Sequence, residues 1–258
     1  LALLATGSGD GIIQLWSTTQ LRLLKTIESN QLAIRQLQFH PNGMQLASAG
    51  ADSTVKLWQV PLGKRIRTYQ GHLKPVRCLA FHPDGTELVS ASWDLTIKKW
   101  SLATSPSVLD AHQHAIQDLD YSHDGKWLAT ASVDKTIKLW QMPHRQLAHV
   151  FSDIQSPVGT VQFSPNGQWL AAGTADGMLY VWDLQTRQLK TKRLAHQKQI
   201  TQVAFTNDSH TIGSVSDDGH IKLWNLTSDQ PIGDMAGHWG AVNTISFSPD
   251  GSRFVTGG

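Results

Sequence analysis

Six tryptophans divide the chain at almost constant intervals. Successive spacings are 42, 42, 40, 42 and 42 residues, and an aspartate stands six positions before each tryptophan. The pairs are Asp10 and Trp16, Asp52 and Trp58, Asp94 and Trp100, Asp134 and Trp140, Asp176 and Trp182, and Asp218 and Trp224. Because residue type, spacing and period repeat together, the sequence predicts a repeat architecture.

Each unit has the pattern of short β-strands separated by turns, with no helical periodicity. We name the four strands of a unit a to d. The best preserved unit covers residues 71–100 and reads GHLKPVRCLAFHPDGTELVSASWDLTIKKW. Apolar residues of its strand a are spaced by three and then two, at Val76, Leu79 and Phe81, which predicts a β-bulge. Asn-Gly or Asp-Gly pairs predict the a–b turns. The turn at 207–209 lacks glycine, so we expect a different geometry there.

The Gly-His pair, the Asp turn and the closing Trp resemble the WD40 family over essentially the whole chain. This resemblance implies an all-β fold, a β-propeller of four-stranded antiparallel blades in a single domain spanning 1–258. The pattern gives five whole blades and partial blades at both ends, because the first and last segments are strand b of a unit. Two interpretations remain: a six-bladed closure, or a piece of a longer, seven-bladed array, which we favour.

Composition restricts the function more weakly than the repeats do. The formal net charge of +2 gives no reason to expect a nucleic-acid partner. No apolar run is long enough to span a membrane, and the N-terminal segment is repeat sequence instead of a signal peptide. The single cysteine, Cys78, is predicted to be a core residue, and we expect a cytoplasmic protein. The 12 histidines have no zinc spacing and no phosphate-binding loop is present, so we expect neither metal nor cofactor.

An Asp, His, Ser/Thr and Trp set recurs in the well-preserved units. A catalytic triad would occur once, so we interpret the repeated set as structural. The resemblance implies a buried hydrogen-bonded tetrad in each of these units. The members are His72, Ser90, Asp94 and Trp100, then His112, Thr130, Asp134 and Trp140, and finally His196, Ser214, Asp218 and Trp224.

Two units depart from this pattern. The second has Asn30 where histidine is expected, and the fifth has Ile154 and Ala172 in place of the histidine and the hydroxyl residue. We therefore expect the fifth unit to be the softest of the whole units.

The family resemblance implies partner binding on the top face, where the d–a and b–c loops lie. Nine residues are predicted to face a partner there: Arg35, Lys74, Arg77, Trp93, Gln117, Thr201, Asp217, Trp239 and Asn243. An aromatic residue beside arginines is typical of binding hot spots and suits an acidic or phosphorylated peptide.

The first functional hypothesis is a non-catalytic scaffold that binds proteins or peptides as part of a larger chain or assembly. The alternative is a sensor propeller attached to a signalling ATPase or kinase. An enzyme with a site in the central channel is third, because every polar cluster found is a repeated one.

Overall fold

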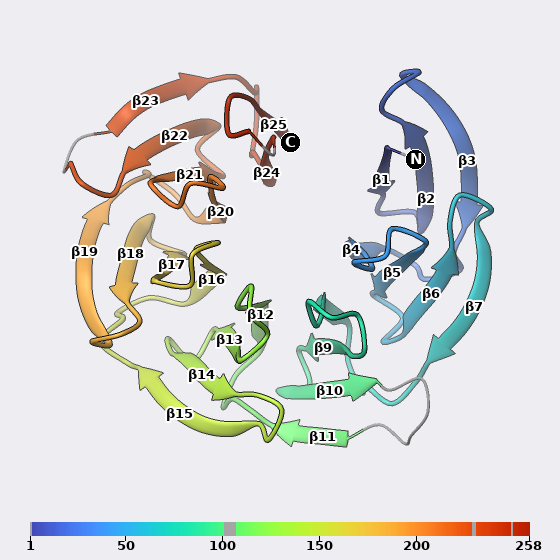
Figure 1. Ribbon diagram of the computed structural model, residues 1–258, viewed down its shortest axis with the longest axis horizontal. Coiled ribbons are helices and arrows are strands. Elements are labelled where there is room, and N and C mark those ends of the chain that lie inside the picture. Colours follow the sequence, from blue (N-terminus) through green and yellow to red (C-terminus); the bar gives the residue numbers. More distant parts are fainter. Residues whose placement is uncertain (1, 101–106, 229–230, 249) are drawn as a thin grey trace. The chain divides into compact units, whose positions relative to one another are not determined.

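A computed structural model describes residues 2–100, 107–228, 231–248 and 250–258, and all of its regular elements are β-strands (Figure 1). Five sheets have four antiparallel strands, one has three and one has two. This arrangement confirms the all-β fold with blades of the propeller type. The chain divides into two compact units, Leu1–Gln117 and Asp118–Gly258.

The first unit holds three sheets with their strands in sequence order, and its strands are as follows. The first sheet is β1 (Leu3–Gly7), β2 (Ile12–Ser17) and β3 (Arg22–Glu28). The second is β4 (Ile34–Phe39), β5 (Gln45–Gly50), β6 (Val55–Gln59) and β7 (Lys64–Tyr69). The third is β8 (Val76–Phe81), β9 (Leu88–Ser92), β10 (Thr96–Trp100) and β11 (Ser107–Asp110).

The strands of the remaining four sheets follow the same order. The fourth sheet is β12 (Ile116–Tyr121), β13 (Trp127–Ser132), β14 (Ile137–Gln141) and β15 (Gln146–Phe151). The fifth is β16 (Val158–Phe163), β17 (Trp169–Thr174), β18 (Met178–Asp183) and β19 (Gln188–Leu194). The sixth is β20 (Ile200–Phe205), β21 (Thr211–Ser216), β22 (His220–Asn225) and β23 (Pro231–Ala236), and the last is β24 (Thr244–Phe247) with β25 (Phe254–Gly257).

The apolar cores lie between consecutive sheets of a unit. In the first unit, Ala49 and Leu57 of the second sheet pack with Leu79 and Trp100 of the third. The Tyr69 ring of β7 lies 5.1 Å from the Trp100 ring, centroid to centroid. Three other closing tryptophans, Trp58, Trp182 and Trp224, likewise pack in clusters with residues of the preceding sheet, as a blade with two apolar faces requires.

The β-bulge predicted in strand a is confirmed. The register with strand b shifts between Ile34 and Gln36, and again between Val76 and Cys78. The same shift occurs in β16 and β20. The residue skipped by the ladder is Arg35 in β4 and Arg77 in β8. A bulge re-aims its extra side chain, and here it determines where the two arginines lie.

The expectation of a different a–b turn at 207–209 is wrong. Ser209 adopts a φ of 63°, in the left-handed region used by Gly43 at 70°. Its N–H donates to Thr206 O at 2.9 Å, as Gly43 N–H does to His40 O at 2.8 Å. The Asp208 carboxylate accepts the N–H of His210 at 2.9 Å, as Asn42 Oδ1 accepts that of Met44, so the turn keeps this bond without glycine.

Side-chain oxygens of one strand a accept backbone N–H groups from the strand a of the next sheet. Gln36 Oε1 accepts from Leu79 N at 2.6 Å, and Gln38 Oε1 accepts from Phe81 N at 2.9 Å. In the second unit, Asp118, Asp120, Gln162 and Gln202 accept in the same way, 43 residues before their donors. These bonds satisfy edge N–H groups that the sheets themselves leave unpaired.

Replacing Gln38 by alanine should lower the free energy of unfolding by about 1–3 kcal/mol, because the Phe81 N–H loses its acceptor. Gln38→Glu keeps an acceptor oxygen and is the matched control. Urea unfolding followed by tryptophan fluorescence measures both. Equal losses in the two variants would contradict the assigned role.

Candidate partner-binding site

In the third sheet, the structure brings together the four residues of the predicted tetrad. His72 Nδ1 lies 2.8 Å from Asp94 Oδ2, and His72 Nε2 lies 2.8 Å from Ser90 Oγ. Trp100 Nε1 donates to the same Ser90 oxygen at 2.8 Å. Asp94 also accepts the backbone N–H of Leu73 at 2.9 Å. The network thus connects the b–c turn and strands b and c to the d–a loop that carries His72 and Leu73.

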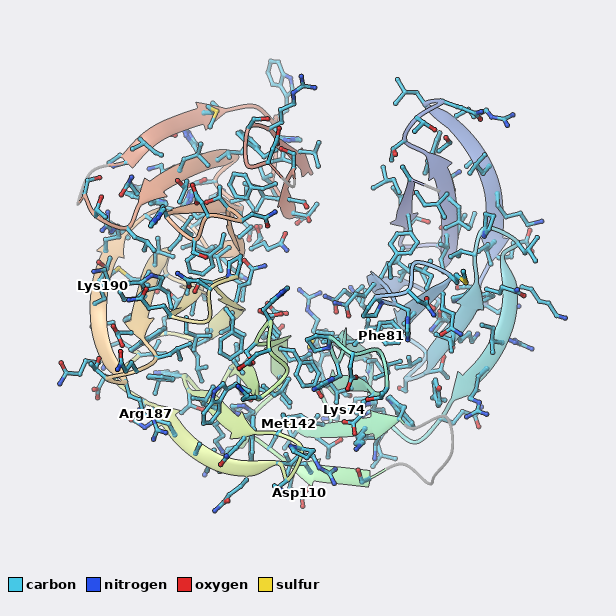
Figure 2. The ribbon with its side chains drawn as sticks, in the orientation of Figure 1. Lys74, Phe81, Asp110, Met142, Arg187 and Lys190 are labelled. Atoms are coloured by element: carbon cyan, nitrogen blue, oxygen red, sulfur yellow. The ribbon has the colours of Figure 1, made fainter. Side chains whose placement is uncertain are left out.

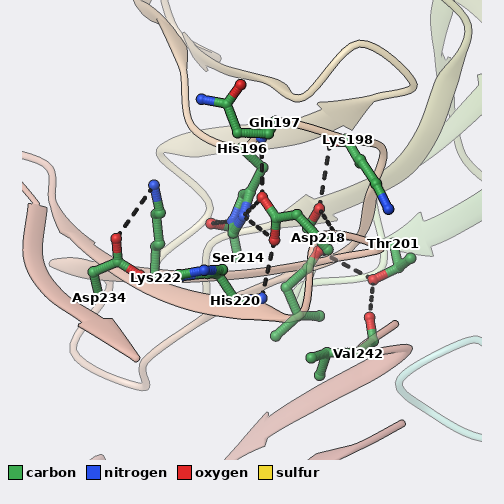
Figure 3. Close-up of polar contacts among 12 residues, drawn as sticks. His196, Gln197, Lys198, Thr201, Ser214, Asp218, His220, Lys222, Asp234 and Val242 are labelled. Atoms are coloured by element: carbon green, nitrogen blue, oxygen red, sulfur yellow. Dashed lines mark hydrogen bonds and ion pairs between the residues drawn. The ribbon is translucent and has the colours of Figure 1, made fainter. Parts of the chain in front are cut away.

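The sixth sheet repeats this network (Figure 3). His196 Nε2 lies 2.8 Å from Ser214 Oγ, to which Trp224 Nε1 donates at 2.9 Å. Asp218 lies 3.1 Å from His196 Nδ1 and accepts the Gln197 N–H at 2.9 Å.

Three residues of the tetrad predicted for the fourth sheet, Thr130, Asp134 and Trp140, lie in the second compact unit. Trp140 Nε1 donates to Thr130 Oγ1 at 3.1 Å, and the Asp134 carboxylate accepts the Thr136 N–H at 3.0 Å. The predicted histidine, His112, is buried in the first compact unit.

The networks shift the pKa values of their ionisable groups. Burial acts to raise the pKa of Asp94, but hydrogen bonds from His72, Thr96 and the Leu73 N–H outweigh it and hold the pKa below its usual range. Burial acts to raise the pKa of Asp218 as well, but the backbone N–H groups of His220 and Gln197, together with His196, outweigh it and lower the pKa. Burial lowers the pKa of His196 despite the opposing charge of Asp218. A neutral His196 can accept from the Ser214 hydroxyl and donate through Nδ1 to Asp218.

These shifts predict a loss of stability on acidification. A neutral buried His196 stabilises the fold above the unfolded pKa of about 6.5, and that contribution is lost as pH falls from there toward the lowered pKa. The aspartates contribute above about pH 4 and lose their contribution as pH falls further. Urea unfolding of wild type and His196→Gln at several pH values measures the first effect. A wild-type minus variant difference that stays constant from pH 7 to 5 would contradict it.

In the second sheet, the place of the tetrad histidine is taken by Gln31 instead of Asn30. Gln31 is completely buried, and its Oε1 accepts from the Ser48 hydroxyl, to which Trp58 Nε1 donates at 2.8 Å. Asn30 is exposed and has a φ of 53°. The backbone at Asn30 is left-handed. The residue that takes the histidine's place is therefore the one after the position that the alignment of units indicates. Lys56 Nζ donates to the Asn30 carbonyl at 3.0 Å and so fixes this loop.

The fifth sheet fills the same space with apolar groups. Ile154 and Ala172 are buried together with Tyr180 and Trp182, whose rings stack at 5.5 Å with an interplanar angle of 7°. Phe151 of β15 packs against Trp182 at 5.0 Å. Tyr180 stands where the second, third, fourth and sixth sheets have lysine. Apolar packing thus replaces the missing tetrad partners, and the expectation that the fifth sheet is the softest stays a prediction.

Tyr180→Ala should therefore lower the free energy of unfolding by about 3–5 kcal/mol, since it opens a cavity beside Trp182. Tyr180→Phe retains the stacked ring and should remain close to wild type. Thermal and urea unfolding compare the two. A small loss for the alanine variant would show that the ring does not support the sheet.

Two loops of the third sheet are fixed to one another at the edge that we call the top edge, where the d–a loops and b–c turns lie. The Ser92 hydroxyl lies 2.9 Å from the carbonyl oxygens of both Lys74 and Pro75. Trp93 N–H donates to Pro75 O at 3.3 Å. Lys74, labelled in Figure 2, therefore lies in a d–a loop that is joined to the turn of Trp93. Both belong to the first compact unit.

The bulged arginines complete this edge. Arg35 Cζ lies 5.9 Å from the centroid of the Trp93 ring, so an exposed cation of the second sheet covers an aromatic ring of the third. Arg77 Nε donates to Gln117 Oε1 at 3.4 Å. Trp93 keeps 37% of its surface exposed, and Leu73 keeps 87%. Arg35, Leu73, Lys74, Arg77 and Trp93 form what we call the Arg35–Trp93 sector.

Comparison with known proteins supports a family assignment. The family model of the IFT122 first beta-propeller matches residues 2–258. The chain belongs to the IFT122 first beta-propeller family. No curated protein matches the chain.

The other predicted partner residues of this IFT122-type propeller lie in the second unit. Thr201 is half-buried, and its hydroxyl lies 3.0 Å from Val215 O and also bonds Val242 O, so it joins β20 to the loop that precedes β24 (Figure 3). Asp217 is half-buried and Asn243 exposed. Trp239 is fully exposed in its d–a loop. Thr201 thus has a structural bond that sequence reasoning missed.

Within the described ranges, no helix is long and apolar enough to cross a membrane. The described His, Cys, Asp and Glu side chains form no group of three that could hold a metal ion.

Proposed function

We propose that the chain is a non-catalytic scaffold that binds a protein segment in a larger assembly through the Arg35–Trp93 sector. Membership of the IFT122 first beta-propeller family supports the general part of this proposal, a protein-interaction role, because this is a scaffold-type family. The observation that carries the site is the contact of Arg35 with a partly exposed Trp93 across two sheets.

The chemistry of the sector favours an acidic or phosphorylated peptide. Arg35, Lys74 and Arg77 form no ion pair with a carboxylate among the described residues. Gln117 orients Arg77 without neutralising it. The planar guanidinium groups can bind carboxylate or phosphate in a bidentate manner. Trp93 and Leu73 offer an apolar anchor beside these charges, and the fixed loops reduce the entropy lost on binding.

Two further elements belong to this proposal. The domain could act as a sensor propeller of a larger signalling chain, since the same sector would then bind an intramolecular segment. A cytoplasmic location is supported by the cysteine content, because a chain whose single cysteine, Cys78, is buried and forms no disulfide suits a reducing compartment. An enzymatic role has no support from a unique polar cluster.

A peptide array tests the sector directly. The immobilised peptides carry a leucine or phenylalanine beside aspartate, glutamate or phosphoserine, and alanine-substituted versions serve as references. Lys74→Glu and Trp93→Ala should each weaken binding of the selected peptides roughly tenfold. Lys198 occupies the position of Lys74 in the sixth sheet, so Lys198→Glu is the matched control.

Equal weakening by Lys74→Glu and Lys198→Glu would show that binding follows total charge and would contradict the sector. Wild-type binding by Trp93→Ala would also contradict it. Circular dichroism confirms that each variant is folded.

A further inference from the structure

A second cationic surface lies on the outer strands of the first two sheets, away from the Arg35–Trp93 sector. Segments 18–28 and 60–70 carry five basic residues and a single acid, Glu28. The basic residues are all exposed, and they are Arg22, Lys25, Lys64, Arg65 and Arg67. We call this set, with the exposed apolar residues between them, the outer cationic rim.

Most of these charges have no carboxylate partner. Arg22 donates to the Gln20 side chain at 2.7 Å, and Lys25, Lys64 and Arg65 form no ion pair with a described acidic residue. On β23 of the sixth sheet the pattern is the opposite, because Asp234 there pairs with both His220 and Lys222. Charged edge strands normally protect against aggregation, but that role does not account for the apolar residues that accompany these charges.

Two leucines protrude from the c–d turns of this surface. Leu21 is 86% exposed beside Arg22, and Leu62 is 63% exposed beside Lys64. Counted from the closing tryptophan, the position of Leu62 is occupied by His144, Thr186 and Ser228 in other units, and that of Leu21 by Arg145 and Arg187. The exposed leucines are therefore a local departure from a repeat that is polar at these positions.

The β6–β7 turn and strand β3 belong to one continuous surface. A Cβ built on Gly63 would lie 3.0 Å from Lys25 Cγ and 2.9 Å from Ile27 Cγ1, so the β6–β7 turn packs directly on β3. Figure 1 shows this turn beside β3. The turn that carries Leu62 and Lys64 thus adjoins Lys25 of the preceding sheet. Leu23 and Ile66, also exposed, extend the apolar component along both outer strands.

We propose that the outer cationic rim docks on the surface of a bilayer that carries anionic phospholipids. Exposed apolar side chains flanked by basic ones suit the boundary between headgroups and acyl chains, where the leucines insert and the cations lie at the phosphates. A bilayer requires no complementary cleft, which fits leucines that protrude singly from turns. The c–d turns lie at the opposite ends of the strands from the d–a loops, so a docked chain keeps the Arg35–Trp93 sector accessible.

Flotation with phosphatidylcholine vesicles, with and without phosphatidylserine, tests the proposal on the 258-residue chain. Wild type should float only with phosphatidylserine vesicles, and less so as salt is raised. Lys64→Glu with Arg65→Glu should reduce vesicle affinity roughly tenfold or more. The matched control is Lys190→Glu with Lys192→Glu, an equal change of charge on exposed residues of β19.

Leu62→Ser should weaken vesicle binding without changing its salt dependence, because it removes insertion and leaves the charges. Three results would overturn the proposal: no flotation of wild type, equal loss in the rim and control variants, or unchanged binding by Leu62→Ser. Binding of polyglutamate that is lost in the rim variants, without vesicle binding, would instead assign the rim to an acidic protein. None of these variants alters the Arg35–Trp93 sector, so the scaffold proposal stands or falls separately.

Discussion

The hydrogen bond between the aspartate of the b–c turn and the backbone of the d–a loop is the interaction on which the top edge of a sheet depends. In the third sheet, Asp94 accepts the Leu73 N–H at 2.9 Å while it is paired with His72. Together with the bonds of the Ser92 hydroxyl and the Trp93 N–H to the same loop, these bonds fix the two loops to one another. With them, the loops that carry Lys74 and Trp93 are held by a network that ends on buried Ser90 and Trp100. Rigid placement of this kind is what a binding surface needs.

The second and fifth sheets lack the tetrad histidine. They show that the volume of the tetrad must be filled and its buried polar groups hydrogen-bonded, whichever residues do so. Gln31 satisfies Ser48 in place of a histidine. In the fifth sheet, Ile154 and Ala172 remove both the imidazole and the hydroxyl, and the stacked ring of Tyr180 occupies the volume. Replacing both partners of a buried hydrogen bond by apolar groups can be nearly neutral, whereas replacing one leaves the other unsatisfied. The two exceptions follow that rule.

Much of the fold could be predicted because the repeat encodes it several times. The Asp–Trp spacing, the Asp-Gly turns and the three-then-two apolar spacing of strand a indicated blades, hairpins and bulges that the structure contains. Gln31 was missed because the units were aligned at a constant distance from the aspartate, and Gln31 stands one residue closer to that aspartate than the tetrad histidines do. The turn at Ser209 was misjudged because this serine adopts the left-handed backbone that glycine adopts in the other a–b turns. The acceptors Gln36 and Gln38 were missed because contacts between sheets depend on their packing.

The candidate site could be predicted only in part. Sequence equivalence placed Arg35, Arg77 and Trp93 on adjacent units, but only the structure shows the Arg35 guanidinium over the Trp93 ring. Thr201 was proposed from the same equivalence, yet its hydroxyl bonds two backbone carbonyls. A position in a repeat fixes the backbone, whereas the local side-chain partners decide whether the residue is free to bind.

The most direct test of this account is the affinity of a sector-binding peptide for Ser90→Ala, compared with Ser214→Ala. Both serines are completely buried and hold equivalent networks, and neither can touch a peptide. If the network of the third sheet positions the Arg35–Trp93 sector, Ser90→Ala weakens binding several-fold while Ser214→Ala binds as wild type does. Equal affinity in the two variants, with both folded, would contradict the account.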